Sequence, residues 1–210
     1  MWSIEVRRLS RPSRDYGRGA DAVKITKVIE EHGRLESVWR IWKYPRMESS
    51  AQRLLHYLHH VLGWSIEKVA DTGIFEKPSL LVVPGNILLN EGINLMWTLA
   101  CGGSGTPWNA ANSYIGVGDG TTAANATQTG LQGTNKAYKV MDAGYPTYGT
   151  AQRAVWQSTF TGTEANFSWQ EITVANGSSD TATNLNRKVQ NLGTKASGTT
   201  WIAQLTITLS

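Results

Sequence analysis

The chain has 210 residues and a formal net charge of +4, with 40% hydrophobic and 17% charged residues. That is enough apolar material for a core and too little charge for an intrinsically disordered protein. The single cysteine excludes an internal disulfide bond, and the apolar stretches are too short and too interrupted to predict a membrane span.

Positive charge is concentrated toward the N-terminus. Residues 1–90 hold 14 Lys and Arg against 10 Asp and Glu, whereas residues 91–210 hold six of each kind. A basic segment can bind a phosphate backbone, but no aromatic ladder or nucleic-acid motif accompanies this one. The charges at its start also argue against a signal peptide. We therefore predict that residues 1–20 form a basic arm that contacts neighbouring chains through Arg7, Arg8, Arg11, Arg14 and Arg18.

Residues 21–85 are predicted to form a region that begins with a β-hairpin. Apolar and polar residues alternate at 23–28 and again at 39–42, with the turn expected at 31–34. Trp39 and Trp42 in the second strand are candidates for contacts with adjacent chains, because aromatic side chains are enriched at protein interfaces.

A helix is expected next, between Ser49 and Gly63, with a strand as the main alternative because the stretch is short. Leucine and valine recur there at helical spacing, a serine can cap the start and the glycine can end the helix. His56 and His60 would stand one turn apart and could share a metal ion with His59 nearby. No third ligand follows at a recognisable spacing, so neutral, partly exposed histidines are the preferred interpretation.

The composition changes near residue 86, and we place a domain boundary there. Residues 64–75 and 79–83 are predicted strands that precede it. Beyond the boundary, residues 86–210 contain few charges and much Gly, Thr, Asn and Ala. A helix is predicted within residues 85–103, because Asn90 can cap it, apolar residues share one face, and Gly102 and Gly103 can stop it.

The remainder of this region shows the two-residue period of β-strands. Residues 201–209 alternate between large apolar side chains and mostly polar ones. In the strand near 170, Phe167 and Trp169 would face one way, and Ile172 and Val174 the other. Gly, Asn, Ser and Asp separate the strands. The chain is therefore predicted to be mainly β, an antiparallel β-sandwich or jelly-roll-like C-terminal domain with one or two short helices.

The glycine-rich stretch GVGDG, residues 116–120, raises the question of a phosphate-binding loop. It lacks the glycine spacing of a dinucleotide fingerprint and the lysine of a P-loop. Asp119 and Gly120 are instead predicted to make a tight turn after a strand at 114–117. The polar segment that follows is expected to lie over a sheet or against a neighbouring subunit.

The carboxylates of the second region do not form a recognisable catalytic pair. A glycosidase needs two carboxylates facing each other across a cleft, and Glu164 and Glu171 are separated by an odd number of positions. No serine carries a nucleophile signature, and Cys101 is expected to be buried at the end of the predicted helix. We predict no enzymatic activity, no cofactor and no metal site.

Five segments of the second region together resemble a known family. In chain order they are ILLNEGINLMWTLACGG, NAANSYIGVGDGTTAANATQTGLQG, MDAGYP, TFTGTEANFSWQEITVANG and LNRKVQNLGTKASGTTWIAQLTITLS. Over about residues 86–210 the chain resembles virion structural proteins of tailed bacteriophages. The resemblance implies a β-rich particle component without enzymatic activity, and it supplies no functional residues.

We therefore expect a structural component of a bacteriophage virion, present in symmetric copies in the tail or its appendages and assembled in the host cytoplasm. Its expected partners are copies of itself and other virion proteins, with no membrane and no nucleic acid. Two alternatives stay open, a capsid decoration or cement protein and a host-surface carbohydrate-binding module. The latter would present aromatic side chains along a groove, for which the candidates are Trp108, Tyr145 and Tyr148.

Overall fold

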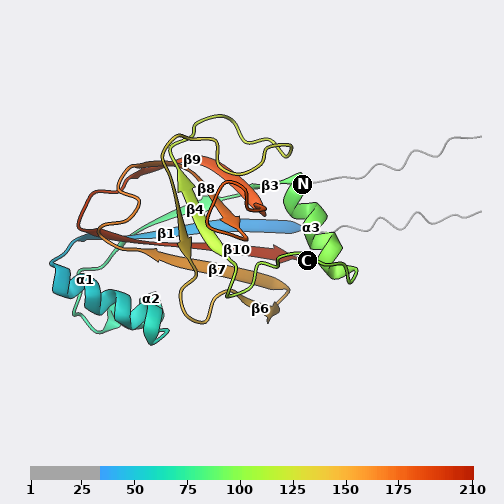
Figure 1. The fold of residues 1–210 in the computed structure, drawn as a ribbon. Helices are drawn as coiled ribbons and strands as arrows, with labels where there is room; N and C mark the ends of the chain where they lie inside the picture. The colour runs from blue at the N-terminus through green and yellow to red at the C-terminus, as the bar shows by residue number, and fades with distance from the viewer. Residues whose placement is uncertain (1–33) are drawn as a thin grey trace, which may run out of the picture.

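The computed structural model describes residues 34–210, which form two antiparallel sheets of five strands each (Figure 1). The first sheet has the order β2-β1-β10-β7-β6, and the second has the order β3-β9-β8-β4-β5. The predicted mainly β fold, a sandwich with a few short helices, is confirmed. The strands of the first sheet are β1 (Leu35–Arg46), β2 (Ser79–Pro84), β6 (Thr147–Thr150), β7 (Arg153–Phe160) and β10 (Thr199–Leu209). Those of the second are β3 (Ile87–Leu88), β4 (Tyr114–Gly118), β5 (Lys136–Val140), β8 (Ser168–Ala175) and β9 (Asn186–Thr194).

Short helices lie at two ends of the sandwich. Between β1 and β2, the chain forms α1 (Ser49–His56), the π-helical turn η1 (Tyr57–Val61) and α2 (Ile66–Asp71). The helix α3 (Asn90–Ala100) follows β3 and lies at the opposite end (Figure 1). The helices predicted between residues 49 and 63 and within residues 85–103 are confirmed.

The main core fills the space between the two sheets and is rich in tryptophan. Trp169 of β8 contacts Phe160 of β7 and Trp201 of β10 edge-on, with ring centroids 4.8 Å apart in both pairs. Such edge-on pairs add to the stabilisation from buried area. The two sheets are therefore joined by interlocking aromatic rings, which are surrounded by Trp39, Ile41, Ile115, Val117, Ile172, Val174, Leu192, Ala203 and Leu205.

A second, smaller core lies on the outer face of the first sheet. Trp42, Tyr44 and Ile202 point outward from β1 and β10 and are covered by the helical segment between β1 and β2. The helical residues that bury them are Leu55, Leu58, Ile66, Val69 and Phe75. The first sheet is thus buried on both faces at this end of the molecule.

The strand predicted at 64–75 is wrong, because this segment contains the helix α2. The Ser65 side chain accepts a hydrogen bond from the backbone N–H of Lys68 and so caps the helix start. Ile66 and Val69, three positions apart, are both buried on the face toward the outer core. The apolar residues of this segment therefore follow helical spacing and not the alternation of a strand.

The first strand of the predicted hairpin, residues 23–28, lies outside the described residues, whereas residues 39–42 lie in β1. Between Val38 and Lys43, β1 is paired along one edge with β10 and along the other with β2. Both edges are therefore occupied by strands distant in sequence. The same pairing places β1 and β2 in one sheet with β10, so the composition change near residue 86 is not a boundary between separate folded bodies.

The strand β8 departs from simple alternation at one point. Its register with β9 shifts between Trp169 and Glu171, so an irregularity interrupts the pleat. As a result Trp169, Ile172 and Val174 all face the main core, and Phe167 packs against it. The prediction that the aromatic and aliphatic residues lie on opposite sides is wrong for this reason.

Candidate functional site

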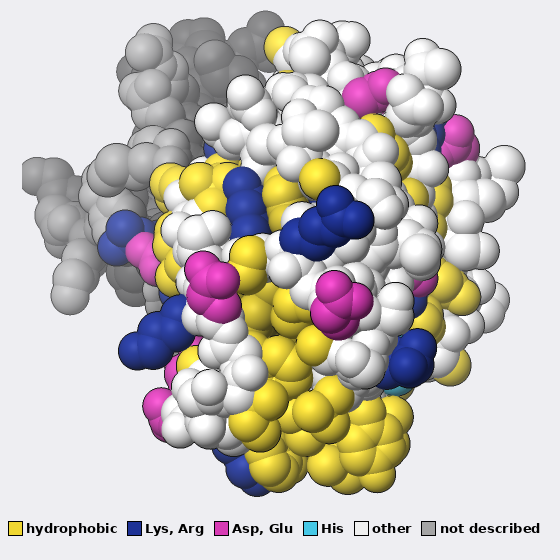
Figure 2. Space-filling view, turned by 90° about the vertical axis from the view of Figure 1, so that its left-hand side faces the viewer, with side chains coloured by type: hydrophobic (Ala, Val, Ile, Leu, Met, Phe, Trp, Pro, Cys, Tyr) yellow, Lys and Arg dark blue, Asp and Glu magenta, His cyan; other side chains and the backbone are white. Residues whose placement is uncertain are grey.

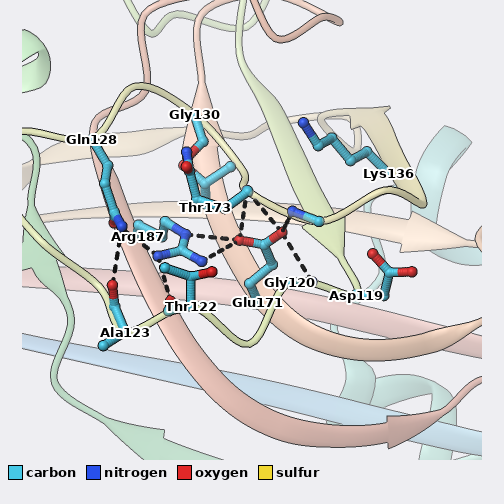
Figure 3. Close-up of polar contacts among 12 residues, drawn as sticks. Asp119, Gly120, Thr122, Ala123, Gln128, Gly130, Lys136, Glu171, Thr173 and Arg187 are labelled. Carbon is cyan, nitrogen blue, oxygen red and sulfur yellow. Dashed lines mark hydrogen bonds and ion pairs between the residues drawn. The ribbon is translucent and has the colours of Figure 1, made fainter.

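The backbone of the long polar loop between β4 and β5, residues 119–135, is hydrogen-bonded to one buried carboxylate. Glu171 of β8 is fully buried and accepts hydrogen bonds from three backbone N–H groups of the loop (Figure 3). The donors are Gly120 at 3.2 Å, Gln132 at 3.0 Å and Gly133 at 2.7 Å. The two ends of the loop are therefore tied to the same side chain.

The charge of Glu171 is balanced by an equally buried arginine from the next strand. The Arg187 Nε atom donates to Glu171 Oε2 at 2.7 Å, and Arg187 Nη2 lies 2.7 Å from the same oxygen. Arg187 Nη1 donates to the carbonyl of Thr122 and to Gln128 Oε1, both in the loop. A fully desolvated ion pair is stable only when its remaining donors and acceptors are satisfied, and here loop residues supply many of the partners.

This geometry explains the glycine-rich stretch. A Cβ atom on Gly118 or Gly120 would collide with the Glu171 carboxylate, so these positions need glycine for close approach. Converging backbone N–H groups are the usual means of binding an anion in a glycine-rich loop. In this protein the anion is the Glu171 side chain, so the stretch is an internal anchor and not a phosphate site.

A second buried carboxylate, Asp142, follows β5. Its Oδ1 atom accepts from the backbone N–H of Thr159 at 3.0 Å, and its Oδ2 atom accepts from the Thr159 hydroxyl at 2.7 Å and from Gln157 Nε2 at 3.2 Å. His60 of η1 places Nδ1 at 3.3 Å from Oδ1. Asp142 thus links β7 to the helical segment that covers the first sheet.

The three histidines of the helical segment have different surroundings. The hydrogen bond to Asp142 raises the pKa of His60, whereas burial lowers the pKa of His56 and that of His59. The His56 and His60 rings stack with centroids 4.8 Å apart. Among residues 34–210, no group of three or more His, Cys, Asp or Glu side chains is arranged to hold a metal ion.

The two glutamates considered for catalysis have separate partners. Glu164 binds Lys139 Nζ at 2.6 Å and accepts from the backbone and hydroxyl of Thr161, whereas Glu171 binds Arg187. Sequence reasoning missed Arg187, because it becomes the partner of Glu171 only when β8 and β9 pair. Cys101, expected to be buried, is exposed.

The aromatic residues proposed as surface contacts fall into three groups. Trp39 and Trp42 are buried in the main and outer cores, so they are not available to another chain. Trp108 is partly buried against the main core. Tyr145 lines a pocket, and only Tyr148 on β6 is largely exposed, at 72%. The arginines of the predicted arm, Arg7, Arg8, Arg11, Arg14 and Arg18, lie outside the described residues.

Exposed hydrophobic side chains gather over the helical end of the molecule, in the lower part of Figure 2. Val61 is 56% exposed and Ile74 is 61% exposed. We call this set the helical apolar surface; it consists of Leu54, Tyr57, Val61, Leu62 and Ile74. A contiguous exposed apolar surface is typical of a protein interaction site.

Comparison with known proteins gives no relative. A scan of protein-family models, a search of curated proteins and a search of solved structures each returned no match. Within residues 34–210, none of the helices has the length and apolar character needed to cross a bilayer.

Proposed function

We propose that this protein is a structural component of a bacteriophage virion, present in symmetric copies that bind neighbouring virion proteins in the tail or its appendages. A capsid decoration or cement protein is the alternative position on the particle. The resemblance of residues 86–210 to phage structural proteins supports the particle assignment, and the mainly β fold agrees with it.

The helical apolar surface is the observation that carries the proposal. Four of its five residues lie close together in the sequence. Leu54 belongs to α1, Tyr57 and Val61 belong to η1, and Leu62 follows η1 directly. They stand beside the outer core, where the inner side of the same segment is fixed to the sheet by Leu55 and Leu58. A segment that is anchored on one side and apolar on the other suits a permanent contact with another chain.

The anchored loop is a second property that suits a structural role. Residues 119–135 are polar and long, yet both ends are tied to the buried Glu171. Loops of this length usually change shape readily. Here the anchor keeps the loop surface in one shape, as repeated contacts in a symmetric assembly require.

The proposal is tested by analysing particles of the phage that encodes the chain. Particles are purified by density gradient, and their proteins are quantified by mass spectrometry. We expect this protein in a fixed number of copies relative to the major capsid protein. Immunogold labelling then distinguishes the tail from the capsid. Absence of the protein from purified particles would overturn the proposal.

A further inference from the structure

A pocket of about 270 Å³ opens on the outer face of the first sheet, next to the outer core. Its floor comes from β1, β10 and β7, and its rim comes from the start of α2 and from the loop between β5 and β6. Its lining includes Arg40, Trp42, Glu67, Tyr145, Gln157 and Gln204. None of them serves the helical apolar surface, so the pocket is independent of the proposed function.

The floor of the pocket is a row of polar side chains that crosses three strands. Arg40 is directly opposite Gln204 in the β1–β10 pair, and Gln204 is directly opposite Gln157 in the β10–β7 pair. Directly opposed residues project from the same face of a sheet. The pocket floor therefore presents a guanidinium, which only donates hydrogen bonds, beside two carboxamides, which both donate and accept them.

The orientation of the two carboxamides is fixed by the buried Asp142. Gln157 is only 4% exposed and donates through Nε2 to Asp142 Oδ2 at 3.2 Å. Its Oε1 atom then accepts from Gln204 Nε2 at 2.9 Å. Since the carboxylate can only accept, this chain of bonds sets which end of each carboxamide donates. The Gln204 side chain is also hydrogen-bonded to Tyr145, which lines the same pocket. Polar groups held in this way are typical of a preformed binding site.

Aromatic and apolar groups form the walls around the polar row. Trp42 and Leu80 face each other across the β1–β2 pair, and Tyr145 lies on the opposite rim. Arg40 and Glu67 contribute one charge of each sign, so the lining has no net charge. Aromatic rings that combine an apolar face with nearby polar groups suit a ligand with one apolar face and several hydroxyls.

We propose that this pocket binds one ring of a neutral saccharide. The apolar face of the ring would pack against Tyr145 and the edge of Trp42, and its hydroxyls would bond to Gln204, Arg40 and Glu67. The volume lies just below the range of about 300–1,000 Å³ that is usual for small-molecule sites, so it suits a single ring. The absence of net charge favours a neutral sugar over a sialic acid or a sugar phosphate.

The test is saturation-transfer NMR with the full chain and defined probes. The neutral probes are methyl glucoside, methyl galactoside, methyl rhamnoside and N-acetylglucosamine, and the charged ones are sialic acid and glucose 6-phosphate. We expect at least one neutral probe to bind with a Kd of about 1 mM, and the affinity to fall about tenfold in Gln204→Ala. Thr206→Ala, which changes the same face of β10 outside the pocket, should bind as wild type does.

A second variant protects the test against misfolding of Gln204→Ala. Glu67 is exposed at the start of α2, so Glu67→Ala should keep the thermal midpoint of the wild type while weakening binding several-fold. No saturation transfer from any neutral probe at about 10 mM would overturn the proposal. Binding of charged probes only, or binding that neither variant weakens, would also overturn it.

Discussion

Two buried carboxylates attach two different parts of the chain to the sandwich, and they do so with different partners. Glu171 holds the loop 119–135 through backbone amides and is paired with the equally buried Arg187. Asp142 holds the helical segment through His60, whose charge changes near neutral pH. The loop is thus attached by a fully buried ion pair, whereas the attachment of the helices includes a partly exposed histidine whose pKa is raised by its hydrogen bond to Asp142.

The largest expected effect comes from breaking the buried Glu171–Arg187 ion pair that anchors the loop 119–135. Arg187→Met leaves Glu171 buried without its cation, and should lower the free energy of unfolding by about 3–5 kcal/mol. Denaturant titration followed by circular dichroism measures this. The matched control is Lys136→Met, which breaks the more exposed pair with Asp180 and should cost less than about 1 kcal/mol. Equal losses in both variants would contradict the assigned role of Glu171.

A methyl group added under the loop should have the next largest effect. In Gly120→Ala, the new Cβ would meet Glu171 and the backbone nitrogen of Gly133, so we expect a loss of up to about 3 kcal/mol from overpacking. Gly144→Ala is the control, since its Cβ would have open space and the cost of its positive φ is about 1 kcal/mol. Calorimetry that finds Gly120→Ala no less stable than this control would argue against close packing of the loop.

The second carboxylate should contribute less than the first. Asp142→Asn replaces one acceptor oxygen by an NH₂ group that must face donors from Gln157 or Thr159. We expect a loss of about 2 kcal/mol, the usual result of one mismatched buried group. Hydrogen exchange should show the helical segment opening more readily while β8 and β9 stay protected. Uniform loss of protection would mean that the helices are not a separately attached layer.

The smallest effect is the contribution of His60 to pH dependence. Its hydrogen bond to Asp142 raises the pKa of His60 above the ordinary value of 6.5. Protonated His60 therefore stabilises the fold fully below about pH 6.5, and this contribution is lost as pH rises through the folded-state pKa. We expect it to be at most about 1 kcal/mol, because the imidazole is partly exposed.

The difference in the free energy of unfolding between wild type and His60→Gln separates the contribution of His60 from those of its neighbours. His56, Lys139 and Glu164 also act on His60, and His56 and His59 have lowered pKa values that oppose its effect. The stability difference between the two proteins should be larger at about pH 5.5 than at about pH 9. A difference that grows with pH would show that the sign is wrong.

The sequence predicted the elements better than it predicted their connections. The alternation in residues 201–209 predicts five inward-facing residues, of which Trp201, Ala203, Leu205 and Ile207 face the main core and Leu209 is half exposed. Alternation failed near residue 170, because a register shift in β8 turns Trp169 and Ile172 to the same side. Periodicity carries no information on such a shift.

The long-range partners could not be predicted from the sequence, for a physical reason. Glu171 and Arg187 come together through the pairing of β8 with β9, and Arg40, Gln204 and Gln157 form a row only when three strands distant in sequence pair in register. Composition and spacing describe each strand alone. A clue to the anchor was present in GVGDG, since glycines that fit no nucleotide motif indicate close approach to something else.

The most direct test of the central claim is incorporation of surface variants into particles. Val61→Asp places a charge in the helical apolar surface, and Val140→Asp places the same charge on β5 of the other sheet. Each variant is supplied together with an equal amount of wild-type protein, and its share in purified particles is measured by mass spectrometry. We expect Val61→Asp to be depleted about tenfold, the result of losing about 1.4 kcal/mol at a contact, and Val140→Asp to match the wild type. Equal incorporation of Val61→Asp and wild type would contradict the claim that this surface binds neighbouring virion proteins.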